Sequence, residues 1–164
     1  MTPFAGIFAV IGIIAVYLRS AFQTTIYGLV SFGIYLLSQL MQLSVGSQFY
    51  NTLPFLAAQN YSLVSKSFTD NLGLFGLGSG VLATVGGIMW GISLIRANIY
   101  PRELGYAFVI GSGLTFNTSA GTGFVTTLFG FVSTLLIYGA LIGFGLHLAT
   151  HPSNSTTTDM LHPT

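Results

Sequence analysis

Five runs of mostly apolar residues, joined by short polar links, make up most of this chain. They cover residues 3–18, 26–46, 72–95, 104–120 and 124–148. Run 72–95 holds no charged residue, and as a helix it would be about 36 Å long, more than the roughly 30 Å hydrocarbon thickness of a bilayer. The pattern predicts an all-α, polytopic integral membrane helix bundle of about five transmembrane helices. We expect one domain, residues 1–149, followed by a polar C-terminal tail, residues 150–164.

The first and fourth runs are the least typical of membrane spans. Run 3–18 is short, and it has neither a basic segment before it nor a convincing cleavage site, so we expect a retained helix rather than a signal peptide. Run 104–120 is apolar only as far as Phe116. We expect its helix to continue through Ala120 with the polar end buried in protein. The alternative is a half-span that turns back, which would leave four full spans. Residues 48–71 predict an interfacial loop.

The second run carries a polar face. Ser31, Tyr35, Gln39 and Gln42 recur at helical spacing and therefore lie on one side of the predicted helix. Such a face is expected to contact protein rather than lipid. We favour the interpretation that the glutamines hydrogen-bond to a neighbouring helix; the alternative is that this face lines a path for a neutral solute.

Small residues mark the faces on which helices are expected to pack. Two GxxxG patterns lie in the third run and further glycines lie in the fifth, which gives the predicted packing set Gly76, Gly80, Gly87, Gly91, Gly139 and Gly143. A glycine stripe lets another helix backbone approach closely. The pattern is common in glycine-rich membrane chains, so we favour packing within the chain over an oligomerisation face.

The few charged residues predict the orientation in the membrane. The chain has four Lys/Arg and three Asp/Glu, and all of them lie in the links or the tail. Arg96, Arg102 and Glu103 surround a short turn that the positive-inside rule assigns to the cytoplasm. We therefore expect a multi-pass plasma-membrane protein with its N-terminus outside and its C-terminus in the cytoplasm. The sequons at Asn60 and Asn117 would then lie outside, but we interpret them as chance matches.

Composition excludes several classes of function. Only 4% of the residues are charged and 52% are hydrophobic, so there is no basic surface for nucleic acid. The absence of cysteine removes disulfides and thiolate metal sites. His147 and His151 have the i, i+4 spacing of a metal or haem ligand pair, but no carboxylate lies nearby in sequence, so they are weak candidates. We predict no catalytic residue, metal or cofactor; a bound lipid is compatible with the sequence.

The segment SLIRANIYPRELG, residues 93–105, carries a resemblance to known proteins. With its flanking apolar runs it resembles the R-x(4)-P-x-x-L-G inter-helix turn of a family of small uncharacterised bacterial and archaeal multi-span proteins. The resemblance implies an α-helical integral membrane protein of undefined activity. It implies no catalytic residue.

These features predict a non-catalytic accessory subunit. A small chain without charge at mid-membrane and with glycine-rich helix faces fits a structural role in a larger membrane complex, such as an energy-transducing one. Its partners would be other integral membrane subunits and the lipid bilayer. A small channel or transporter for a neutral solute is the alternative. A haem- or metal-binding subunit that uses His147 and His151 is a second alternative.

Overall fold

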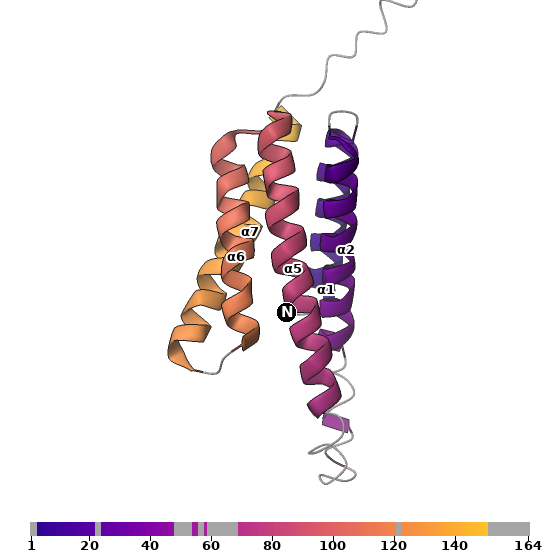
Figure 1. Ribbon diagram of the computed structural model, residues 1–164, viewed down its shortest axis with the longest axis vertical. Helices are drawn as coiled ribbons and strands as arrows, with labels where there is room; N and C mark the ends of the chain where they lie inside the picture. The colour runs from indigo at the N-terminus through magenta and orange to yellow at the C-terminus, as the bar shows by residue number, and fades with distance from the viewer. Residues whose placement is uncertain are drawn as a thin grey trace, which may run out of the picture.

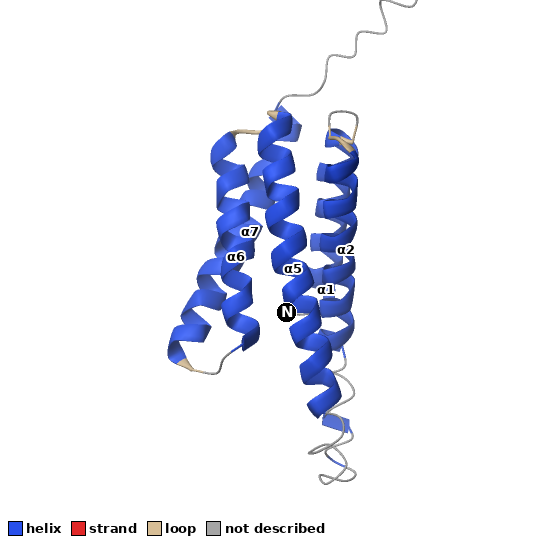
Figure 2. Cartoon of the chain, viewed as in Figure 1, coloured by secondary structure: helices blue, strands red, loops and turns tan. Residues whose placement is uncertain are grey.

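The structure, a computed structural model, has five helices among the residues that it describes. It describes residues 3–21, 24–47, 54–55, 58, 69–120 and 123–150. The helices are α1 (Pro3–Ser20), α2 (Ile26–Ser47), α5 (Thr69–Ala97), α6 (Arg102–Ala120) and α7 (Phe124–Thr150). No strand occurs in the described ranges, so the all-helical prediction is confirmed there (Figure 2). The predicted interfacial loop, apart from a few of its residues, and the tail beyond Thr150 lie outside these ranges.

Three of the helices are long and apolar enough to cross a membrane. They are Ile26–Gly46, Gly73–Ala97 and Phe124–Thr150. The first helix is a shorter apolar helix over Gly6–Ser20. The fourth, α6, is one continuous helix through Ala120, without the reversal that a half-span requires. The membrane helix bundle is therefore supported by three helices on length and composition alone.

The five helices form a ring, with their axes running along the length of the molecule (Figure 1). Helix α2 packs against α5, α5 against α6, and α6 against α7. Helix α1 closes the ring by contacting both α2 and α7, and these two contacts are less extensive than the others. Neighbours in the ring are thus mostly neighbours in the chain, as expected for short connections.

Local chemistry fixes the turn between α5 and α6. Asn98 ends α5 in the left-handed region, at φ 52°, and its N–H donates to the Ile95 carbonyl. Asparagine tolerates this conformation better than most residues. Pro101 then precedes the first residue of α6, where a missing N–H costs nothing. The turn reverses the chain within a few residues and so sets α5 and α6 side by side.

An aromatic cluster fills part of the ring. We use this name for Tyr35 of α2, Trp90 of α5 and Phe108 of α6, each with 1% or less of its surface exposed. Their ring centroids lie 5.3 to 5.6 Å apart, within the range of favourable edge-to-face contact. Phe144 extends the cluster to α7, with its centroid 6.4 Å from that of Phe108. One cluster therefore joins four of the five helices.

Glycines allow the helix backbones to meet. A Cβ placed on Gly86 of α5 would lie 2.6 Å from the backbone nitrogen of Tyr35, and one on Gly28 of α2 would lie 2.6 Å from the Ser93 hydroxyl. Real Cβ atoms do not approach other atoms this closely. The α2–α5 crossing therefore requires glycine at position 86, where the neighbour is backbone, whereas a side chain at position 28 would displace the side chains of Ser93 and Thr24.

The predicted packing glycines differ in what surrounds them. Added Cβ atoms on Gly87, Gly91 and Gly143 would meet Ser112, Val109 and Leu104 on the adjacent helices, so these three lie at helix contacts. Gly76 and Gly139 have no atom within 4 Å of such a Cβ. Gly80 is buried. Sequence reasoning did not assign Gly86, Gly105 and Gly111, each of which faces a neighbouring helix.

The outer surface of the ring is apolar. Phe8, Leu74 and Phe124 are 72%, 70% and 83% exposed, and many other large apolar side chains on all five helices are exposed too. Soluble monomers rarely expose contiguous apolar surface on this scale. The outer face is therefore suited to lipid.

We predict that Gly86→Ala destabilises the bundle by about 1–3 kcal/mol, because its methyl group would collide with the Tyr35 backbone. Gly78→Ala on the same helix is the control: its added Cβ meets nothing within 4 Å, and alanine favours helix by up to about 1 kcal/mol. Thermal unfolding in detergent, followed by circular dichroism, measures both changes. Equal unfolding midpoints for the two variants would contradict a close contact between α2 and α5 at Gly86.

Candidate functional site

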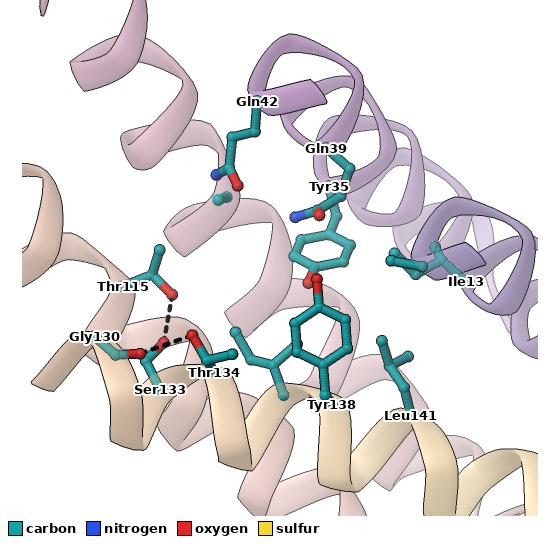
Figure 3. A pocket seen from close by; sticks show the side chains of 13 residues that line it. Ile13, Tyr35, Gln39, Gln42, Thr115, Gly130, Ser133, Thr134, Tyr138 and Leu141 are labelled. Atoms are coloured by element: carbon teal, nitrogen blue, oxygen red, sulfur yellow. Dashed lines mark hydrogen bonds between the residues drawn. The ribbon is translucent and has the colours of Figure 1, made fainter. Parts of the chain in front are cut away.

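A cleft of about 300 Å³ lies inside the ring, and all five helices contribute to its lining (Figure 3). This volume is at the lower end of the range of small-molecule sites, roughly 300–1,000 Å³. The lining residues are Ala9, Ile13, Tyr35, Gln39, Gln42, Ala83, Thr115, Gly130, Ser133, Thr134, Ile137, Tyr138 and Leu141.

The cleft lies toward one end of the bundle. Gln42 is near the end of α2, Thr115 is near the end of α6, and Gly130 is near the start of α7, and these helix ends lie together in Figure 1. At its other limit the cleft reaches Tyr35, which also belongs to the aromatic cluster. The cleft and the aromatic cluster therefore follow one another along the inside of the ring.

One wall of the cleft comes from the predicted polar face of α2. Tyr35, Gln39 and Gln42 all line the cleft, and Figure 3 shows both amides directed into it. Neither amide makes a hydrogen bond to another described residue, so the favoured expectation that the glutamines bond a neighbouring helix finds no support in the described part of the chain. Ser31 is buried elsewhere on α2, and its hydroxyl donates to the Gly28 carbonyl at 3.0 Å.

The facing wall carries hydroxyl groups from α6 and α7. Ser133 donates to the Gly111 carbonyl at 2.8 Å, and the Thr115 and Ser133 hydroxyls lie 2.9 Å apart. Thr134 donates to the Gly130 carbonyl of its own helix at 2.8 Å (Figure 3). The two contacts of Ser133 hold the α6–α7 pair together at the level of the cleft.

Sequence reasoning did not assign this second wall. Gly130, Thr134 and Tyr138 recur at i, i+4 within an otherwise apolar run, which is the signal that marks one face of a helix. The helix that this face of α7 contacts is determined only when the five helices close into a ring. The α2 glutamines and the α7 hydroxyls are far apart in sequence, and only the tertiary fold brings them to one cleft.

The lining of the cleft combines apolar and polar side chains, and none of them is charged. It offers amide, phenol and hydroxyl groups, which can form hydrogen bonds and cannot neutralise an ion. An ion in such a site would lose its hydration without gaining a counter-charge. The chemistry of the cleft therefore favours a neutral polar molecule.

The other predicted site residues lie at the opposite end of the bundle. Arg96, Arg102 and Glu103 are exposed around the α5–α6 turn. Beside them Tyr100 is buried, and its hydroxyl donates to the Val16 carbonyl of α1 at 3.3 Å. Burial raises the pKa of Tyr100 to about 12, against the opposing effect of Arg19, so the phenol remains neutral.

The histidine pair receives no support as a metal site. The ring of His147 packs edge-on against Tyr100, with centroids 5.9 Å apart. His151 lies outside the described residues, as does the sequon at Asn60. Within the described residues no group of three or more potential metal ligands occurs.

No protein-family model matches this chain, and no curated protein or solved structure matches it. The resemblance of residues 93–105 to an inter-helix turn therefore stays a prediction. What this chain does has to be inferred from its own residues.

We predict that the cleft contains water, which cysteine labelling can test because the chain has no native cysteine. Gln42→Cys should react with a small polar maleimide, since the reactive thiolate forms only in water. Leu40→Cys is the control: Leu40 is 47% exposed on the apolar outer face of the same helix and should stay unlabelled in a bilayer. Equal labelling of both variants would contradict a hydrated cleft.

Proposed function

We propose that all five helices cross the bilayer, with the N-terminus outside and the C-terminus in the cytoplasm. Helices α1 and α6 have 18 and 19 residues and are therefore about 27 and 29 Å long, close to the thickness of the hydrocarbon layer. Arg19, Arg96 and Arg102 lie at one end of the ring, which the positive-inside rule places in the cytoplasm. In this orientation the cleft lies in the outer half, and a reagent added outside intact cells reaches Gln42→Cys.

We further propose that the chain binds a small neutral polar solute in the cleft, as a channel or transporter. The observation that carries this proposal is the arrangement of the cleft: uncharged amides of α2 face uncharged hydroxyls of α6 and α7 inside the ring. A polar site within an apolar ring costs free energy unless its groups find hydrogen-bond partners. A neutral solute with polar groups supplies those partners.

The aromatic cluster would act as the barrier on this path. Tyr35, Trp90 and Phe108 are almost fully buried and fill the ring next to the cleft. A solute in the cleft can pass toward the arginine-bearing end only if these rings separate. In the described conformation the path is therefore closed on that side.

We expect solute uptake by vesicles that contain the purified protein, measured by light scattering after an osmotic step with small neutral solutes. The double variant Gln39→Leu, Gln42→Leu should lose this uptake, because it removes both amides from the cleft. Ser44→Ala, an exposed position on the same helix, should retain it. Uptake that is equal in protein-free vesicles and in vesicles with the protein would contradict the proposal.

A second candidate function is that of an accessory subunit in a larger membrane complex. It is favoured by glycines on α5 and α7 that face open space: added Cβ atoms on Gly73, Gly76, Gly78, Gly139 and Gly145 would meet nothing within 4 Å. Such positions permit close approach of a further transmembrane helix. The two functions use different surfaces, the interior of the ring and its exterior.

If the chain is a subunit, purification in mild detergent should bring down a larger assembly. Gly76→Leu should disrupt this assembly by projecting a bulky side chain from α5. Gly33→Leu is the matched control, because Gly33 is equally open but lies on α2. Size-exclusion chromatography and identification of the co-purified chains provide the measurement. A wild-type protein that purifies alone would exclude this role.

A further inference from the structure

The α6–α7 wall of the cleft presents acceptors. A serine or threonine hydroxyl has one hydrogen to donate and two lone pairs that accept. Ser133 gives its hydrogen to the Gly111 carbonyl, and Thr134 gives its hydrogen to the Gly130 carbonyl, each at 2.8 Å. Thr115 lies within reach of both the Gly111 carbonyl, at 3.1 Å, and the Ser133 hydroxyl, at 2.9 Å. With these hydrogens engaged inside the protein, Thr134 in particular offers oxygen lone pairs to a ligand.

The α2 wall presents donors as well as acceptors. Each glutamine amide carries two N–H donors and one carbonyl acceptor. Gln39 and Gln42 are both directed into the cleft, and neither hydrogen-bonds to another described residue. Tyr35, only 1% exposed, adds a phenol at the deeper limit of the cleft. A ligand between the walls therefore meets the lone pairs of Thr134 on one side and amide groups that both donate and accept on the other.

We propose that the cleft selects small polyols. This inference rests on the proposed uptake of neutral solutes, which does not specify the chemical class of the solute. A hydroxyl group both donates and accepts, so a polyol can donate to the α6–α7 wall while it accepts from the α2 amides. An ether or ketone only accepts, and it leaves the lone pairs of Thr134 that face the cleft unpaired. An anion gains nothing from those lone pairs and meets no positive charge in the lining.

Trp90 supplies a local reporter for a binding experiment. It is the only tryptophan in the chain, and its ring centroid lies 5.6 Å from that of Tyr35, which lines the cleft. Its indole N–H has no hydrogen-bond partner among the described residues. The full-length protein in lipid nanodiscs is titrated with glycerol and with 1,2-dimethoxyethane, an acceptor-only solute with the same number of non-hydrogen atoms. Glycerol should change the Trp90 emission saturably, and the ether should not.

Two threonines on α7 give a matched pair of variants. Thr134 lines the cleft, whereas Thr127 does not, and each hydroxyl donates to the carbonyl four residues earlier in the helix. Thr134→Val should weaken glycerol binding about fivefold, the effect of one net hydrogen bond. Thr127→Val should leave the binding curve unchanged, which controls for loss of the same local bond.

The outcomes distinguish the selection of polyols from the proposed uptake of neutral solutes. Saturable binding of glycerol alone, weakened by Thr134→Val and not by Thr127→Val, supports selection of polyols. Equal saturation by glycerol and the ether overturns the selection but leaves uptake of neutral solutes standing. Uptake by vesicles of non-hydroxylated solutes alone overturns the selection in the same way. Absence of both saturable binding and vesicle uptake overturns both proposals.

Discussion

The close approach of α2 and α5 is the constraint on which the rest of the structure depends. At this crossing Gly86 lets the backbone of α5 reach the backbone nitrogen of Tyr35. The approach fixes Tyr35 between two environments, with the aromatic rings of Trp90 and Phe108 on one side and the cleft on the other. Helices α6 and α7 then pack onto this pair, and α1 closes the ring. A wider crossing would separate the aromatic cluster and remove the boundary of the cleft.

The side chains inside the ring differ in polarity from those outside it. Outside, large apolar side chains such as Phe8 and Leu74 are exposed on the helices. Inside, polar groups gather on one level, and none of the residues that line the cleft is charged. In hydrocarbon the aggregation of apolar side chains contributes little, so close packing and hydrogen bonds must hold the helices together. The glycine contacts and the bond from Ser133 to Gly111 are examples of each.

Much of the fold was accessible from the sequence, because apolar runs and a helix period report local structure directly. The polar face of α2 was also predicted, and Tyr35, Gln39 and Gln42 lie together on the cleft. The facing hydroxyls of α7 were not assigned, because a threonine in an apolar run gives no sign of the helix it will meet. The same reason explains Gly86: it lies one residue before the GxxxG pattern that begins at Gly87, and only the direction of α2 sets it against the backbone of Tyr35.

The buried serines have a consequence for how the chain reaches its membrane. Ser31, Ser38 and Ser79 each donate to the carbonyl three residues earlier in their own helix. A hydroxyl that is satisfied locally needs no second helix to offset its transfer into lipid. Transfer of these serines into lipid therefore makes no demand on a neighbouring helix, whereas the amides of Gln39 and Gln42, which make no hydrogen bond to a described residue, still need partners.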